Sequence, residues 1–173
     1  MKQRNIKTPL VFRLGVVMLC MLIISSNMVG DLYARYTAAV SSVAAAVPST
    51  LPEKWDFVNI PHSWNAIDGQ DGDADYYRGV CYYAKKLLKV DLPEADQYYL
   101  EFRGTNSSAD VYVNGKHLGH HDGGYSTWRV NLTDTLEAEN LVVVAVDNRA
   151  NNTVYPQNAD FTFYGGMYRD VNI

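Results

Sequence analysis

The chain has 173 residues, a formal net charge of -4 and a pI near 5.5, so it lacks the basic excess typical of nucleic-acid-binding proteins. Its composition, 47% hydrophobic, 20% charged and 12% aromatic, excludes a disordered or fibrous protein. Without a targeting segment, this length indicates one domain that buries a single core.

Residues 1–44 are predicted to be an export signal and its processing region. The basic residues before the apolar run are Lys2, Arg4, Lys7 and Arg13. The uncharged run at 14–24 is shorter than the roughly 20 apolar residues of a spanning helix. We therefore expect export to the periplasm or the extracellular space, with a membrane anchor only if the signal stays uncleaved. Residues 45–54 have the composition of a linker, and residues 55–173 form the predicted domain.

The predicted domain is all-β. Short runs of Val, Tyr, Leu and Phe alternate with clusters of Gly, Asn and Asp, as in β-sandwiches and barrels. The expected strands are 80–88, 97–103, 109–113, 116–120, 127–132, 141–148 and 168–173.

Two of these strands carry clear burial patterns. Ala109, Val111 and Val113 alternate with polar residues, which predicts one buried face. Residues 141–146 (LVVVAV) are apolar throughout, which predicts a strand covered on both faces in the middle of the sandwich. Asn114-Gly115 predicts a two-residue hairpin turn, because such a turn needs positive φ at both central positions.

The acidic segment 68–75 (DGQDGDAD) is a candidate calcium site. Aligned as an EF-hand from Asp71, it has Tyr76 where a sharp turn needs Gly and Tyr82 where a bidentate Glu is required. An EF-hand is excluded, and we expect a solvated turn, with an irregular calcium site as the alternative.

Other reactive residues favour structural roles. His120 and His121 are adjacent on a predicted strand, so they face opposite sides and cannot bind one metal ion together. We predict no metal site. The pair His62 and Ser63 lacks the glycine pattern of a nucleophile elbow, so His62 is expected to be structural. Cys81 is expected to be a buried strand residue, because no histidine lies near it in sequence.

Aromatic side chains raise a further alternative, since carbohydrate modules stack sugars on exposed rings. Trp55, Trp64 and Trp128 are the tryptophan candidates. In a small sandwich, however, such large rings supply much of the buried apolar surface, so we expect these three to lie in the core.

Six segments carry a resemblance to a known family. They are 60–65 (IPHSWN), 75–83 (DYYRGVCYY), 111–115 (VYVNG), 121–125 (HDGGY), 146–148 (VDN) and 160–171 (DFTFYGGMYRDV). In order and spacing they resemble the amino-terminal domain of family 2 glycoside hydrolases, over roughly residues 55–173. The resemblance implies a jelly-roll β-sandwich of the galactose-binding type, closer to β-galactosidases than to β-glucuronidases or mannosidases.

The same resemblance implies that the catalytic residues lie elsewhere. In that family two glutamates of a (β/α) barrel, which follows an immunoglobulin-like domain, perform hydrolysis, and a retaining pair stands about 5 to 5.5 Å apart. The glutamates here match none of the family's catalytic motifs and are expected to be solvated. They are Glu53, Glu94, Glu101, Glu137 and Glu139. We therefore expect no catalytic residue and no activity in this chain alone.

The resemblance also implies one substrate-binding residue in this chain. Asp160 matches the aspartate that the β-galactosidase domain sends toward the active site to touch a sugar hydroxyl and, in some members, a sodium ion. The barrel supplies the other ligands of that ion, so we expect no cofactor in this chain, and sodium or magnesium only in the full-length enzyme. Arg169 and Asp170 look like a structural pair, because the guanidinium fork suits a carboxylate.

Two functions follow from the resemblance. The first is the amino-terminal sugar-binding domain of a β-galactosidase-type enzyme of carbohydrate metabolism, here without the catalytic barrel. The alternative is a free-standing secreted carbohydrate-binding module. The final residues 169–173 (RDVNI) resemble a strand that leads into the next domain, which favours the first. The expected partners are a weakly bound β-galactoside-like carbohydrate and the missing immunoglobulin-like and barrel domains.

Overall fold

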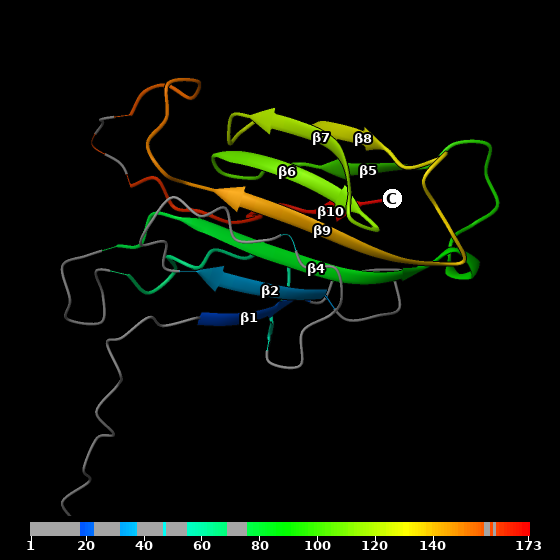
Figure 1. Ribbon diagram of the computed structural model, residues 1–173. Helices are drawn as coiled ribbons and strands as arrows, with labels where there is room; N and C mark the ends of the chain where they lie inside the picture. Colours follow the sequence, from blue (N-terminus) through cyan, green and yellow to red (C-terminus); the bar gives the residue numbers. More distant parts are fainter. Residues whose placement is uncertain are drawn as a thin grey trace, which may run out of the picture.

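The computed structural model describes residues 18–22, 32–37, 47, 55–68, 76–157, 160 and 162–173. Within them, two antiparallel sheets pack face to face (Figure 1). The larger sheet contains, in spatial order, β1 (Met18–Leu22), β2 (Leu32–Thr37), β4 (Val80–Leu88), β9 (Glu139–Asp147), β6 (Ser108–Val113) and β7 (Lys116–Asp122), with β3 (Asp56–Phe57) paired to β2. The smaller sheet contains β10 (Val171–Asn172), β5 (Tyr99–Phe102) and β8 (Trp128–Asn131). A short 3-10 turn, η1 (Lys89–Asp91), follows β4.

The main core lies between the two sheets and follows the period-two alternation of the strands. From β6 it takes Ala109, Val111 and Val113, none of which is more than 1% exposed. The smaller sheet faces them with rings such as Phe102 and Trp128, which stack with centroids 4.4 Å apart. The alternation read from the sequence in this strand is therefore confirmed.

A second apolar cluster covers the opposite face of β4 and β9. Trp55 packs there with Tyr82, Ala84 and Val143, all buried. Since Val142 and Val144 of the same strand face the main core, β9 is covered on both sides, as its continuous apolar sequence predicts. Figure 1 shows β4 and β9 running side by side through the middle of the larger sheet.

The β6–β7 hairpin has the turn that the sequence predicts. Asn114 has φ 52° and Gly115 has φ 79°, both in the left-handed region. Asn114 also anchors the turn to β9, because its Oδ1 accepts a hydrogen bond from the Leu141 amide at 2.9 Å. An asparagine suits this position, since it tolerates positive φ better than other residues with a Cβ.

Each of the seven predicted strands overlaps a strand of the structure, with ends that differ by a few residues. Three strands were not predicted. β3 is one, and β1 and β2 fall inside the range assigned to the export signal, where β2 pairs with β4. The prediction of a cleaved signal stays untested. In the described part of the chain, no helix has the length and hydropathy needed to cross a membrane.

We expect Gly115→Val to destabilise the fold by about 1 to 3 kcal/mol, because a β-branched residue is strained at positive φ. No atom lies within 4 Å of the position that a Cβ at Gly115 would occupy. The loss of stability therefore reports backbone strain and not a steric clash. Urea unfolding measures it. Lys116→Val, at the exposed next position, is the matched control and should change stability by about 0.5 kcal/mol or less. Equal stability of the two variants would contradict the turn assignment.

Candidate functional site

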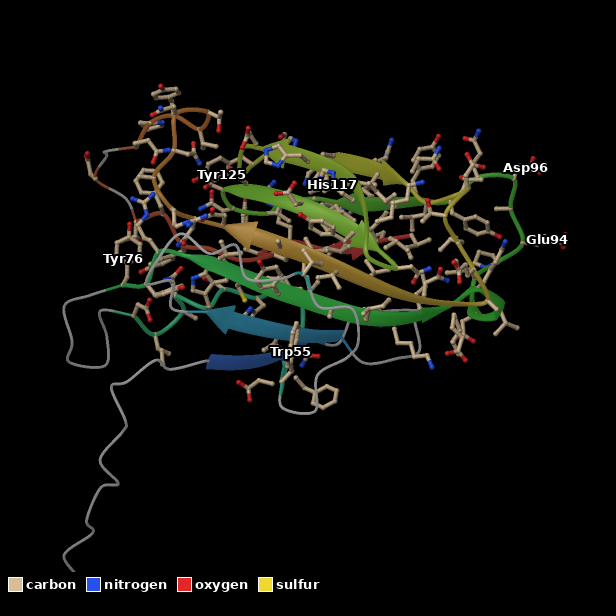
Figure 2. All side chains as sticks on the ribbon, in the orientation of Figure 1. Trp55, Tyr76, Glu94, Asp96, His117 and Tyr125 are labelled. Atoms are coloured by element: carbon tan, nitrogen blue, oxygen red, sulfur yellow. The ribbon has the colours of Figure 1, made fainter. Side chains whose placement is uncertain are left out.

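The predicted sugar-contacting residue, Asp160, is exposed on the long segment that follows β9. In Figure 2 the segment after β9 lies at the end of the sandwich where Tyr76 is labelled, and Glu94 and Asp96 are labelled at the opposite end. Residues 158, 159 and 161 lie outside the described part of the chain, so the site is defined by the groups that hold the segment on either side of Asp160.

Asn148, the first residue after β9, fixes the start of that segment. It is fully buried, and its Oδ1 accepts a hydrogen bond from the Gly79 amide at 2.7 Å. Its amide nitrogen contacts the carbonyl oxygens of Tyr77 and Phe163 at 3.2 and 2.8 Å. The same nitrogen lies 3.3 Å from Oδ1 of Asn65. One side chain thus ties together segments of the chain that are far apart in sequence.

Asn65, also fully buried, completes this polar network. Its amide nitrogen donates to Oδ2 of Asp68 and to the carbonyl of Tyr77, at 2.7 and 2.8 Å. Its Oδ1 accepts from the Gly165 amide at 2.7 Å. Because a buried amide without partners costs free energy, the bonds of Asn65 and Asn148 position the segments they join as well as stabilising them.

Arg78 contacts the Asp160 segment on both sides of that residue. Its Nη2 lies 3.4 Å from Oε1 of Gln157, and its guanidinium carbon stands 5.0 Å from the ring centroid of Phe163. Its Nε also donates to the carbonyl of Asn148 at 2.8 Å. The described residues that flank Asp160 are therefore held by one cation.

The part of the segment that follows Asp160 is fixed at Gly166, where the backbone requires a glycine. Gly166 has φ 138°, and a Cβ there would lie 2.3 Å from the carbonyl oxygen of His62. Its backbone pairs with that of Asn106, whose side chain also donates to the carbonyl of Tyr164 at 2.7 Å. Tyr164 packs edge-on against Tyr76, with centroids 6.3 Å apart. Two tyrosines that are not buried thus pack together at the end of the sandwich where Figure 2 labels Tyr76.

The tryptophan and cysteine predictions are confirmed. Trp55, Trp64 and Trp128 are 5%, 2% and 9% exposed, so none presents a face to a sugar. Cys81 is fully buried in β4. Of the calcium candidate, residues 68–75, only Asp68 lies in the described part of the chain, and its carboxylate accepts a hydrogen bond from Asn65.

The histidines have the following contacts in the structure. His62 Nδ1 lies 3.1 Å from the hydroxyl of Tyr83, and Ser63 donates to the carbonyl of Gly165 at 2.8 Å, so the two side chains serve the loop and not each other. His120 and His121 face opposite sides of β7. The ring of His121 stacks on Trp128 at 5.0 Å, and burial lowers the pKa of His121.

Two sequence expectations need correction. Arg169 does not pair with Asp170: its Nη1 donates to the carbonyls of Arg103 and Tyr125, while Asp170 lies 3.6 Å from the Arg103 guanidinium. The two side chains have separate partners because Arg169 is taken up by backbone carbonyls that the sequence does not identify.

The second correction concerns Glu101, which is not simply solvated. Its carboxylate accepts a hydrogen bond from Arg129 Nε at 2.7 Å, and Arg129 together with Arg103 lowers the pKa of Glu101. A carboxyl group held ionised in this way is unsuited to act as a general acid. Glu94, Glu137 and Glu139 are exposed as expected, and Glu53 lies outside the described part.

The segments that resemble the family contain Asn65, Arg78 and Asn148, for which the sequence predicts no role. Their partners lie up to 100 residues away, so only the folded arrangement reveals the network. The available signal was polar residues placed directly beside apolar strand sequence.

The model of the family described as "Glycosyl hydrolases family 2, sugar binding domain" matches residues 34–173. The chain belongs to this family. The family 2 domain begins, by this match, within the range that the sequence assigned to the signal. Its two-sheet architecture is the jelly-roll β-sandwich expected from the resemblance.

Relatives of the family 2 domain include both sugar specificities. A beta-glucuronidase of Bacteroides fragilis is 41% identical over 118 residues, which are 67% of this chain and 17% of that protein. A beta-galactosidase of Thermoanaerobacter pseudethanolicus is 30% identical over 122 residues, 68% of this chain and 16% of that protein. The chain therefore spans about a sixth of the length of these relatives.

Solved structures agree with this assignment. A Bacteroides uniformis beta-glucuronidase superposes with a TM-score of 0.65 at 38% identity, covering 76% of this chain and 16% of the other. A putative beta-galactosidase from Bacteroides fragilis gives 0.62 at 43% identity, covering 68% and 18%. This chain corresponds to the amino-terminal sugar-binding domain of such enzymes.

We expect Asn148→Ala to lower the free energy of unfolding of the family 2 domain by about 3 kcal/mol, because it leaves the buried Gly79 amide and two carbonyls without this partner. Asn152→Ala, exposed on the same segment, is the control and should stay within about 0.5 kcal/mol of the parent. Urea unfolding compares them. Similar losses in both variants would show that the buried network does not stabilise this end of the sandwich.

Proposed function

We propose that this domain supplies a sugar-hydroxyl contact, Asp160, to the glycoside-binding site of a family 2 enzyme, and that it contains no hydrolytic centre of its own. The observation that carries the proposal is an exposed carboxylate on a segment that is anchored at both ends by buried or stacked groups. An anchored segment holds such a carboxylate near one position before the sugar arrives, which reduces the ordering cost of binding.

The chemistry fits recognition more than catalysis. An ionised carboxylate is an acceptor for sugar hydroxyls and contributes roughly 1.5 to 3 kcal/mol per charged hydrogen bond. Retaining hydrolysis needs a second carboxyl group at about 5 to 5.5 Å. The described glutamates are exposed at other positions or, for Glu101, occupied by arginines.

We propose a β-galactoside as the sugar, on the resemblance of the Asp160 segment to that of β-galactosidases. The relatives are named for both galactosides and glucuronides, and the hydroxyls that a carboxylate recognises occur in both sugars. The binding experiment below therefore compares galactose and lactose with glucuronate. Sodium or magnesium belongs to this proposal only in a full-length enzyme, where other domains supply the remaining ligands.

The alternative is a free-standing carbohydrate-binding module, which needs a flat exposed ring. All three tryptophans are buried, so such a platform would have to come from exposed tyrosines such as Tyr125 and Tyr155. We also propose export of the protein, on the basic and apolar sequence of residues 1–44, with anchoring to the membrane if that segment is retained.

We expect the purified chain not to hydrolyse nitrophenyl β-galactoside or nitrophenyl β-glucuronide, because it lacks the carboxylate pair. A release assay over a day at neutral pH checks this. Turnover that copurifies with the domain through a second column and persists in Asp160→Ala would reveal a hydrolytic site elsewhere in the chain.

We expect galactose to bind more weakly than about 1 mM, because millimolar affinity already requires about 4 kcal/mol and one carboxylate supplies less. Titration followed by NMR, with galactose, lactose and glucuronate in parallel, measures affinity and sugar class. Asp160→Ala should abolish the shifts, and Asp96→Ala, at the opposite end of the sandwich (Figure 2), should leave them unchanged. Binding in the tens of micromolar that survives Asp160→Ala would overturn the proposal and favour the module.

A further inference from the structure

Four titratable side chains form a cluster on the outer face of the β6–β7 hairpin, where Figure 2 labels His117. Asp110 Oδ1 lies 2.7 Å from His117 Nε2 and 3.0 Å from His120 Nδ1. The other ring nitrogen of His120, Nε2, lies 3.2 Å from Asp122 Oδ1. The imidazole of His120 is therefore held between two carboxylates.

An irregularity in β7 creates this cluster. Val111 pairs with Gly119, but the next residue, Tyr112, pairs with His117, so Leu118 is an extra residue in β7. In a regular strand, residues three apart face opposite sides. The extra residue shifts the alternation and brings His117 and His120 onto the same face, on either side of Asp110.

The geometry around His120 favours one protonation state. A neutral imidazole has one N–H group, so one of its nitrogens would present a lone pair to a carboxylate oxygen. Only the imidazolium ion donates to both Asp110 and Asp122. The arrangement of the two carboxylates therefore selects the protonated ring.

Asp122 connects this histidine to the segment that carries Asp160. Ser108 donates to Asp122 Oδ1 at 2.6 Å. The side-chain nitrogen of Asn151 lies 3.4 Å from the Ser108 hydroxyl, and Asn151 Oδ1 in turn accepts from the backbone amide and the hydroxyl of Thr153. The start of the segment is thus attached, through Ser108, to the same carboxylate that faces His120.

We propose that protonated His120, bridging Asp110 and Asp122, is a proton-operated clasp that holds the segment after β9 against the β6–β7 hairpin. The clasp is independent of the proposed sugar binding, because it requires no ligand. When the ring loses its proton, one of the two contacts becomes repulsive, and the hold of Asp122 on the segment loosens.

The charges around His120 stabilise its protonated form. Burial alone would lower the pKa of His120, but hydrogen bonds and charges from Asp110 and Asp122 outweigh it and raise the pKa above the ordinary 6.5. The hydrogen bond from Ser108, followed by contacts with His120 and Thr153, lowers the pKa of Asp122 below the ordinary 3.8. The titratable groups nearest the cluster are Tyr112 on β6, Tyr82 on β4, and the Asp147–Arg149 pair at the end of β9.

The pH window follows from these directions. The stability contributed by His120 is fully present below about 6.5 and is lost as pH rises through its higher folded pKa. The contribution of Asp122 is present above about 3.8 and is lost as pH falls through its lower folded pKa. The clasp is therefore closed in mildly acidic solution and opens as the pH rises through the pKa of His120.

NMR titration of the whole chain from pH 5 to 9 tests the clasp without any sugar. We expect the ring of His120 to titrate above 6.5 and the backbone amides of Thr153 and Val154 to shift with the same midpoint. Hydrogen exchange of these amides, corrected for intrinsic rates, should be several-fold faster on the alkaline side. A His120 midpoint at or below 6.5, or amides that do not follow it, would overturn the proposal.

Three variants separate the clasp from general effects of pH. His120→Gln, which cannot carry the charge, should remove the titration of the Thr153 amide. Asp122→Asn should remove it too, and should lower the His120 midpoint while leaving Asp110 in place. His117→Gln is the matched control, because His117 contacts Asp110 but the structure gives it no bond to Asp122 among the described residues. If His120→Gln does not fold, Asp122→Asn decides alone. A pH-dependent shift of the Thr153 amide that persists in Asp122→Asn would overturn the proposal.

Discussion

The hydrogen bonds of one buried side chain, Asn148, organise the end of the sandwich on which the proposed function depends. A carboxamide taken out of water must recover every bond it gave up, or the fold loses about 1 to 3 kcal/mol for each group. Asn148 recovers them from Tyr77 and Gly79, which directly precede β4, and from Phe163, far along the chain. These partners fix where β4 begins and where the segment after β9 returns. The segment that carries Asp160 is therefore anchored by a network that is itself buried.

Much of the fold could be predicted because its causes are local. The alternation of Ala109, Val111 and Val113 reports a half-buried strand, and Asn114-Gly115 reports a turn with positive φ at both positions. The unbroken apolar run in β9 correctly indicated burial on both faces, although the sequence could not say that Trp55 supplies the second cover. In each of these cases the physical constraint acts within a few residues, so the pattern carries it.

The parts that escaped prediction depend on distant partners or on the count of residues in a strand. Asn65 meets Gly165 across 100 residues, and no local pattern marks that pairing. The extra residue at Leu118 reverses the alternation of β7, so that His117 and His120 share a face that a regular strand would divide between them. Arg169 is a further case, since its partners are backbone carbonyls, which no residue type identifies in advance. Asp160 was found only by resemblance to a family, because a single exposed aspartate carries no distinguishing pattern.

Rigid anchoring and an exposed tip suit a domain that completes a site formed by other parts of a protein. An aspartate in open water gains little from one sugar hydroxyl, because the hydrogen bond replaces others made with solvent. The same carboxylate gains more once neighbouring surfaces exclude water, since the lower dielectric strengthens its interaction. What the domain can contribute in advance is placement, and Asn148, Asn65 and Arg78 are positioned to supply it at the two ends of one segment. The protonation of His120 would then act on that placement through Asp122, which gives the sandwich a means of altering the site without touching the sugar.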